Sequence, residues 1–340
     1  MTTRVAGVAG LTFRPWHGPA DYPGLAAANQ RTRDAAGIAE VITTERMTRD
    51  YAHLVNCDLD RDLLVAERDG GIVGYARVDW RDKEDGGRTF QCITLLQPDA
   101  AEPAAYEAML AWAEERQAAK ARMVPDTDAH PGLLRAYTFG TETVLGDVLM
   151  ARGWTRVGRG HEMVRPTLDD IPDRPLPSGI EVRPIANDPG ARRRLWDAAT
   201  EAFADERDEV APTEEDWLGH LEDPFADPAL WVVGFDGDEI ASAAQGRIDP
   251  DENAHHGRER GYIEAVFTRR PWRRRGLARA LLVRALVRLR DHGMTSAYLG
   301  VDGLNPNQAM DLYTDLGFAI ANTSHDWSKP LTEEAPGAAE

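Results

Sequence analysis

One stretch decides the fold of this 340-residue chain, and it reads Tyr262-Ile263-Glu264-Ala265-Val266-Phe267-Thr268-Arg269-Arg270-Pro271-Trp272-Arg273-Arg274-Arg275-Gly276-Leu277-Ala278-Arg279. Its largely apolar first part predicts a strand, and Gly276 opens an amphipathic helix that extends to His292. The turn between them has the form Arg-x-x-Gly-x-Ala, which brings free backbone N–H groups and the positive end of the helix together. We therefore expect the turn to bind an anion such as a pyrophosphate, which the small residues at 276 and 278 let approach the backbone.

The elements around this stretch occur twice along the chain. Leu11–Pro15 resembles Ile180–Pro184, and the hairpin signal Asp69-Gly70 resembles Asp236-Gly237, at a spacing of about 170 residues in both cases. Four prolines in the segment 166–179 exclude a helix interior or a central strand there. The predicted ranges are a first domain at 1–165, a linker at 166–179, a second domain at 180–330 and a disordered tail at 331–340.

Both repeats have the same predicted order of elements: a strand, helical residues, a hairpin, a fourth strand, a long helix, a fifth strand, a short helix and a last strand. In the second repeat the short helix begins at Asn305-Pro306 and ends at Gly317. This order predicts an α/β fold in which a mixed sheet lies between two helical layers, present as two tandem copies. The polar segment 249–260 predicts a disordered hairpin tip rather than a loop that covers a substrate.

Composition excludes several classes of protein. With 39 Lys+Arg against 57 Asp+Glu, the formal net charge is -18, which argues against a nucleic-acid binder and against binding to an anionic membrane surface. No apolar run is long enough to span a membrane. Cys57 and Cys92 are expected to be reduced thiols of a cytoplasmic protein, and no Cys/His spacing suggests a metal site. The six arginines between 269 and 279 are an exception to the acidity and predict a local anion site.

Two signatures resemble those of the GNAT N-acetyltransferase superfamily. Arg273-x-x-Gly276-x-Ala278 after a Val-containing strand resembles the acetyl-CoA pyrophosphate loop of that family. The segment from Asn305 to Phe318 is similar to the N…A..LY..LGF segment that follows it. The chain thus resembles tandem-domain members of the superfamily, a type that includes mycothiol synthases. The resemblance implies an N-acetyltransferase that uses acetyl-CoA as co-substrate, without a metal.

The resemblance also implies roles for individual residues. Glu264 takes the place of the general base, acting on the amine through a water, and Tyr313 takes that of the general acid for the departing thiolate. A regular strand would place Tyr262, Glu264 and Val266 on one face. The implied cofactor-binding residues are Val266, Phe267, Thr268, Arg273, Arg274, Arg275, Gly276, Leu277, Ala278, Arg279 and Asn305.

The first repeat lacks these features. After Pro98 its loop contains Asp99 and Glu102 but neither arginine nor glycine. Pro103 stands at the position of Gly276 and removes an N–H donor, and Leu149 stands at that of Tyr313. We therefore expect a degenerate first domain that does not bind acetyl-CoA, supports the second domain and contributes a wall of the acceptor cleft.

Several alternatives remain open at this point. Tyr313 shares a helical face with apolar residues and is also suited to a core, and Glu264 is also suited to an ion pair or a substrate contact. Other carboxylates near the end of the first helix of the second repeat, at Glu201, Asp205 and Glu206, favour a solvated acidic face over a base.

The function leaves alternatives too. A non-catalytic module that senses acyl-CoA is the second hypothesis, and nucleic-acid binding through the arginines is the third. The acceptor is a small-molecule amine in the leading hypothesis, with aminoglycosides, protein N-termini and a mycothiol-type cysteinyl glucosaminyl inositol as candidates. Against the last, mycothiol synthases carry their strand carboxylate two residues earlier, where this chain has Tyr262. The chain is expected to be a monomer or a homodimer.

Overall fold

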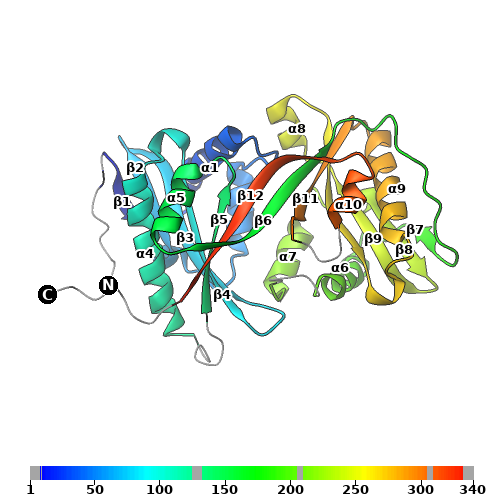
Figure 1. Cartoon of the computed structure of the whole chain (residues 1–340), viewed down its shortest axis with the longest axis horizontal. Helices are drawn as coiled ribbons and strands as arrows, with labels where there is room; N and C mark the ends of the chain where they lie inside the picture. Colours follow the sequence, from blue (N-terminus) through cyan, green and yellow to red (C-terminus); the bar gives the residue numbers. More distant parts are fainter. Residues whose placement is uncertain (1–7, 9, 125–131, 205–209, 305–308, 332–340) are drawn as a thin grey trace. The chain divides into compact units, whose positions relative to one another are not determined.

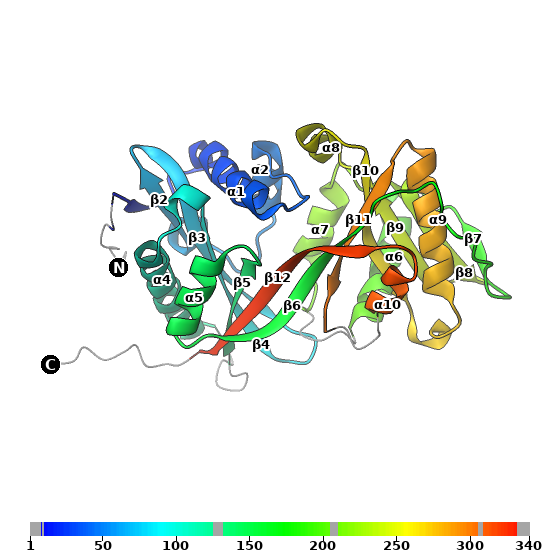
Figure 2. The ribbon, with the colours of Figure 1, turned by 45° about the horizontal axis from the view of Figure 1, so that its top comes forward.

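The structure is a computed structural model that describes residues 8, 10–124, 132–204, 210–304 and 309–331. The chain forms two compact units (Figures 1 and 2). Unit 1 consists of Met1–Arg159 together with Ser324–Glu340, and unit 2 of Gly160–Thr323. In the part of the chain that the structure describes, no helix has both the length and the apolar character needed to cross a membrane.

Unit 1 is a mixed sheet with helices on both faces. Its strands are, in spatial order, β1 (Thr12–Pro15), β2 (Leu63–Arg68), β3 (Gly71–Asp82), β4 (Arg88–Leu96), β5 (Gly132–Phe139) and the end of β12 (Ala319–Pro330). Only the pair β4–β5 is parallel. The helices are α1 (Tyr22–Ala36), α2 (Thr44–Ala52), α3 (Leu59–Asp62), α4 (Pro103–Ala121) and α5 (Thr143–Ala151), with short 3-10 turns at Pro19–Asp21 and Pro98–Ala100.

Alternation along the strands of unit 1 produces two separate cores. Tyr75 of β3 packs with the α1 and α2 side chains Leu25 and Met47. Its neighbour Ala76 belongs to the other core, which contains Leu110 of α4. Successive residues of a strand point to opposite faces, so the sheet packs against a layer of helices on each side.

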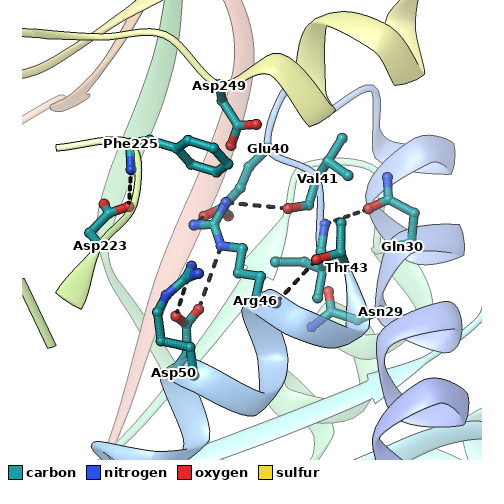
Figure 3. Close-up of polar contacts among 12 residues, drawn as sticks. Asn29, Gln30, Glu40, Val41, Thr43, Arg46, Asp50, Asp223, Phe225 and Asp249 are labelled. Carbon is teal, nitrogen blue, oxygen red and sulfur yellow. Dashed lines mark hydrogen bonds and ion pairs between the residues drawn. The ribbon is translucent and has the colours of Figure 1, made fainter. Parts of the chain in front are cut away.

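The segment between α1 and α2 is held by hydrogen bonds within unit 1 (Figure 3). Thr43 caps α2, since its hydroxyl accepts from the backbone N–H of Arg46 at 3.1 Å. The Gln30 side-chain oxygen accepts from the backbone N–H of Ile42 at 2.7 Å, and the Arg46 guanidinium donates to the carbonyl of Val41 at 3.2 Å. These bonds give the connection a defined path without regular secondary structure.

Unit 2 repeats the architecture of unit 1. Its strands are, in spatial order, the end of β6 (Thr155–Arg165), β11 (Ser296–Asp302), β10 (Arg260–Thr268), β9 (Glu239–Arg247), β8 (Trp231–Asp236) and β7 (Glu181–Arg183). The pair β10–β11 is parallel and the others are antiparallel. The helices are α6 (Pro189–Phe203), α7 (Glu214–Glu222), α8 (Pro250–His256), α9 (Leu277–Asp291) and α10 (Ala309–Thr314), with 3-10 turns at Pro228–Leu230 and Arg270–Trp272.

Helices α9 and α6 lie on opposite faces of this sheet. A Cβ added at Gly261 of β10 would lie 2.6 Å from a methyl group of Leu289 in α9, so only glycine allows that helix to pack this close. On the other face, the ring of Phe267 lies 6.1 Å from that of Phe203 in α6. The predicted α/β fold with two tandem copies is confirmed.

The last strand of each sequence repeat completes the sheet of the other. β6, the end of the first repeat, pairs with β11 from Gly160 to Arg165, and β12, the end of the second repeat, pairs with β5 from Ser324 to Pro330. Trp327 of β12 is only 1% exposed in the core of unit 1, and its indole N–H donates to the Thr138 hydroxyl at 3.0 Å. The domain ranges predicted along the chain therefore describe sequence repeats and stay a prediction, whereas the compact units share strands.

Two predicted segments of irregular structure have different outcomes. The prediction of a disordered hairpin tip at 249–260 is wrong, because this segment contains α8. Asp249 caps that helix by accepting from the backbone N–H groups of Asp251 and Glu252, and Gly257 ends it with φ 60. Of the predicted tail 331–340, residues 332–340 lie outside the described residues, and the backbone N–H of Leu331 donates to the carbonyl of Gly132.

His220, near the end of α7, lies among aromatic rings of unit 2. Its ring centroid is 5.0 Å from that of Trp196, 5.9 Å from that of Trp217 and 6.1 Å from that of Trp231. Burial lowers the pKa of His220 from 6.5 to about 4, and the charge of Arg192 acts in the same direction. The native state therefore keeps this imidazole neutral.

Stability is expected to depend on pH through His220. Below pH 6.5 the unfolded chain binds a proton at this imidazole that the folded chain does not bind until about pH 4. The free energy of unfolding should therefore fall as the pH drops from 6.5 to 4, by up to about 3 kcal/mol from this group. Urea denaturation of the wild type and of His220→Phe at pH 7 and pH 5 measures the contribution of His220. An equal fall in the free energy of unfolding of both proteins would contradict the prediction.

Candidate active site

A cavity of about 450 Å³ lies in unit 2 where two parallel strands diverge. β10 and β11 pair from Arg260–Ser296 to Ile263–Leu299, and no further pair follows among the described residues. Beyond that point the cavity opens between them, lined by residues of β10, β11, α6, α9, α10 and the turn before α9. Such divergence exposes the backbone edge of β10 to a ligand, since β9 occupies only its other edge.

Glu264 occupies a β-bulge in β10. In the pairing with β9, Ile263 opposes Gly246 and Ala265 opposes Gln245, so Glu264 is the extra residue. The prediction that Tyr262, Glu264 and Val266 share one face is wrong for this reason.

The register with β9 shows the change of face directly. Tyr262 opposes Arg247 and Val266 opposes Ala244, and residues three apart on β9 point to opposite faces. The Glu264 carboxylate lies 3.7 Å from the Arg247 guanidinium, on the face of Tyr262. The bulge thus turns Glu264 and Val266 to different sides, although both line the cavity.

The turn before α9 has the geometry of an anion site. Arg274 and Gly276 both have left-handed backbones, with φ 60 and φ 82. Gly276 is the N-cap of α9 and provides no side-chain cap, so the first N–H groups of the helix face the cavity without one. A Cβ built at Gly276 meets no atom within 4 Å, so the space beside this backbone is open. Together these features suit a diphosphate.

Arg273 anchors this turn. Its Nε donates to the carbonyl of Thr268 at 3.0 Å and its Nη2 to the carbonyl of Ala202 at 2.9 Å. The side chain therefore connects the turn with the end of β10 and with α6, while also lining the cavity.

Carboxylates from distant segments offset part of the predicted arginine charge. Arg269 forms ion pairs with Glu201 at 2.6 Å and with Glu239 at 3.1 Å. Arg279 forms one with Asp315 at 2.5 Å, which connects α9 with the residue after α10. The count of arginines therefore overstates the positive charge available to an anion at this turn.

Tyr313 lies on α10 and lines the same cavity, with 7% of its surface exposed. Its ring is 6.1 Å from that of Phe318, and its carbonyl accepts from the Phe318 backbone N–H at 3.1 Å. Arg165 of β6 braces this turn by donating to the carbonyl of Leu316. Glycine is favoured at 317, because the φ of 82 is left-handed and a Cβ would displace the Arg165 guanidinium.

Most of the residues implied as cofactor-binding line the cavity. They are Val266, Phe267, Thr268, Arg273, Arg274, Gly276, Leu277, Ala278 and Arg279. Arg275 does not line it, and donates instead to the carbonyl of Ser178 at 3.2 Å. Asn305 lies outside the described residues. Of the alternative carboxylates, Glu201 pairs with Arg269, while Asp205 and Glu206 also lie outside the described residues.

Comparison with known proteins shows the family of the chain. Residues 191–318 match the Acetyltransferase (GNAT) family. A mycothiol acetyltransferase from Nocardiopsis dassonvillei is 30% identical over 238 residues, which are 62% of this chain and 69% of the relative. The chain belongs to the GNAT acetyltransferase family. It is an N-acetyltransferase, as the two sequence signatures predicted.

Solved GNAT structures resemble the fold over the whole chain. A GCN5-related N-acetyltransferase from Sphaerobacter thermophilus superimposes with a TM-score of 0.72 at 23% identity, covering 96% of this chain and 97% of the other. A tandem GNAT protein from the clavulanic acid biosynthesis pathway superimposes with a TM-score of 0.64 at 14% identity, covering 97% and 100%. The tandem GNAT architecture is therefore confirmed, and acetyl-CoA is the co-substrate that the family uses.

Sequence reasoning missed two residues next to the site, Arg247 and Arg165. Arg247 contacts Glu264, and Arg165 contacts the turn that follows Tyr313. Neither belongs to a contiguous motif. The only local signal was the position of Arg247 at the end of the hairpin strand, directly before the Asp249 cap.

Proposed function

We propose that this GNAT protein transfers an acetyl group from acetyl-CoA to the primary amine of a small molecule, by direct attack in a ternary complex in unit 2. One observation carries the proposal: a single cavity joins the uncapped start of α9 to both Glu264 and Tyr313. The carboxylate of Glu264 and the hydroxyl of Tyr313 would thus lie near the reacting end of a ligand that is bound at the proposed anion site.

The residues present fit acetyl-CoA. Backbone N–H groups at Gly276–Ala278 would hold the diphosphate, and the open edge of β10 at Val266–Thr268 would hold the pantetheine amides. When bound, acetyl-CoA supplies a thioester carbonyl that an amine can attack. The N–H groups of the open strand edge would also donate to that carbonyl oxygen as charge develops on it.

Glu264 and Tyr313 would handle the two protons. The Glu264 carboxylate accepts the proton that the attacking amine loses, either directly or through one water. The Tyr313 hydroxyl holds the proton that the leaving sulfur needs. Both side chains line the cavity, which supports these roles, while Tyr313 also belongs to the core and Glu264 also pairs with Arg247.

We propose that unit 1 does not bind acetyl-CoA, because its own side chains form hydrogen bonds at the end of β4, the strand that corresponds to β10. The carbonyl of Leu96, at the end of β4, accepts from the Thr32 hydroxyl at 3.1 Å. The Gln97 side chain accepts from Arg31 at 2.6 Å, and Pro103 stands in the first turn of α4. A pantetheine arm would have to displace these contacts, whereas β10 keeps an open edge.

The acceptor side of unit 2 favours a cationic amine. Asp223, Asp249 and Glu264 lie around the guanidinium of Arg247, and Arg192 acts on Asp223 and Glu264 over a longer distance, so three carboxylates face two cations. The relative from Nocardiopsis dassonvillei is a mycothiol acetyltransferase, which makes a mycothiol-type amine the first acceptor to test. Tyr262 in place of the expected strand carboxylate argues for including other small amines in the same screen.

Two measurements test the proposal. Titration with acetyl-CoA should raise the melting temperature, since a ligand at about 100 times its Kd stabilises by about 2.7 kcal/mol. Release of free CoA should then appear with at least one amine in a library of cationic small molecules. No thermal shift would contradict acetyl-CoA binding, and a shift without CoA release by any amine would favour the non-catalytic sensing module.

A further inference from the structure

Arg247, the last residue of β9, is buried beside the base proposed above. It is 9% exposed, and carboxylates of three different segments surround its guanidinium. The nearest oxygens are those of Asp223 at 2.8 Å, Glu264 at 3.7 Å and Asp249 at 3.9 Å. A cation this deeply buried is stable only because these anions compensate it.

Two of the three carboxylates are fixed by other bonds. The second oxygen of Asp223 accepts from the backbone N–H of Phe225 at 3.0 Å (Figure 3), and the Phe225 ring lies 5.4 Å from the guanidinium carbon of Arg247. Asp249 is the cap of α8. Arg247 is therefore held in place independently of Glu264 and provides a fixed reference point for it.

Glu264 lies where the sheet is irregular. It is the extra residue of the bulge, and β11 no longer pairs with β10 at this level. Its side chain is 28% exposed, toward the cavity. A carboxylate in this position gains orientation from the charged groups that face it.

The charged groups around Glu264 come from several elements. Arg247 faces it from β9, and Arg192 of α6 interacts with its charge over a longer distance. Asp223, which follows α7, and Asp249, which precedes α8, are negatively charged like Glu264. Both of them pair with Arg247. Arg247 thus lies within ion-pair distance of Glu264.

We propose that Arg247 is a positioning residue for catalysis: it orients the Glu264 carboxylate toward the acceptor amine and keeps it ionised at neutral and mildly acidic pH. The inference rests on the proposed role of Glu264 as base. An adjacent opposite charge favours the ionised carboxylate, so Arg247 extends the pH range over which Glu264 can accept a proton.

The test is the pH dependence of kcat at saturating acetyl-CoA and amine, with the amine identified by the screen, because kcat/KM also reports the ionisation of the free amine. Arg247→Gln should move the acid limb of the profile up by about one pH unit and lower the rate about tenfold on that limb, with recovery at high pH. Arg247→Lys keeps the charge and should restore most of the shift. The Kd of acetyl-CoA should stay unchanged in both variants, because Arg247 does not line the cofactor cavity.

Glu264→Gln separates this inference from the proposed function. If Glu264→Gln retains full turnover, Glu264 is not the base and the proposed function is wrong in that respect. If Glu264→Gln is inactive while Arg247→Gln keeps the wild-type pH profile, only the role of Arg247 is overturned. A lysine variant as impaired as the glutamine variant would likewise contradict an electrostatic role. Should Arg247→Gln fail to fold, the pair Asp223→Asn/Arg247→Gln removes the uncompensated carboxylate and allows the same profile to be measured.

Discussion

Replacing Gly276 by aspartate is expected to weaken acetyl-CoA binding at least about 100-fold while unit 2 stays folded, a loss of about 2.7 kcal/mol in binding free energy. The backbone of Gly276 has φ 82, so any side chain adds strain of about 1–2 kcal/mol. An added Cβ would meet no atom within 4 Å, so the protein itself has room for the side chain. The carboxylate would project beside the uncapped N–H groups of α9 and repel a diphosphate there.

Two further variants separate the causes of that loss. Gly276→Ala carries the same backbone strain without the charge, and should reduce affinity far less. Pro103→Ala, at the equivalent position in unit 1, should leave the affinity unchanged. Isothermal titration of acetyl-CoA at low salt measures all three. Equal losses with aspartate and alanine would assign the effect to strain, and a loss with Pro103→Ala would contradict the division of labour between the units.

The local backbone around the proposed anion site could be predicted because its determinants are contiguous. The strand, the left-handed turn and the helix start all lie between Arg260 and Asp291, and the helix predicted from Gly276 to His292 is observed as Leu277–Asp291. A motif of this kind specifies local backbone geometry, and local geometry is what a sequence pattern encodes most directly.

The charged surroundings of Glu264 could not be predicted in the same way. Arg247 receives its carboxylates from Asp223, Asp249 and Glu264, which lie on different elements and meet only in the folded unit. The bulge at Glu264 is equally invisible to strict alternation, because one extra residue reverses the faces of all that follow.

The exchange of the last strands between the two repeats could not be predicted from the sequence for a related reason. The periodicity of β6 and β12 predicts strands but does not specify their partners. Trp327 of β12 donates to Thr138 of β5, and this contact joins residues that are far apart in the chain. The positive charge of the six arginines between 269 and 279 was overestimated for the same reason, since the carboxylates that pair with Arg269 and Arg279 come from other segments.

Replacing Tyr313 by phenylalanine is expected to lower turnover about 100-fold while the Kd of acetyl-CoA stays nearly the same. Phenylalanine keeps the ring that packs near Phe318, so the buried surface of α10 is preserved and only the hydroxyl is lost. That hydroxyl is the proposed proton donor to the leaving sulfur. The sulfur needs this proton in the transition state and not when acetyl-CoA binds. The expected result is therefore a fall in kcat without a matching change in affinity.

Tyr298→Phe is the matched control for this prediction. Tyr298 of β11 is 8% exposed, close to the 7% of Tyr313, but its hydroxyl donates to Glu252 at 2.6 Å and it does not line the cavity. Loss of that hydroxyl should reduce stability and leave kcat near the wild-type value. If both variants lower kcat equally, the effect belongs to the packing of unit 2. If Tyr313→Phe leaves kcat unchanged, Tyr313 has only a packing role. The proton for the leaving sulfur would then come from solvent, because phenylalanine has no hydroxyl group to donate it.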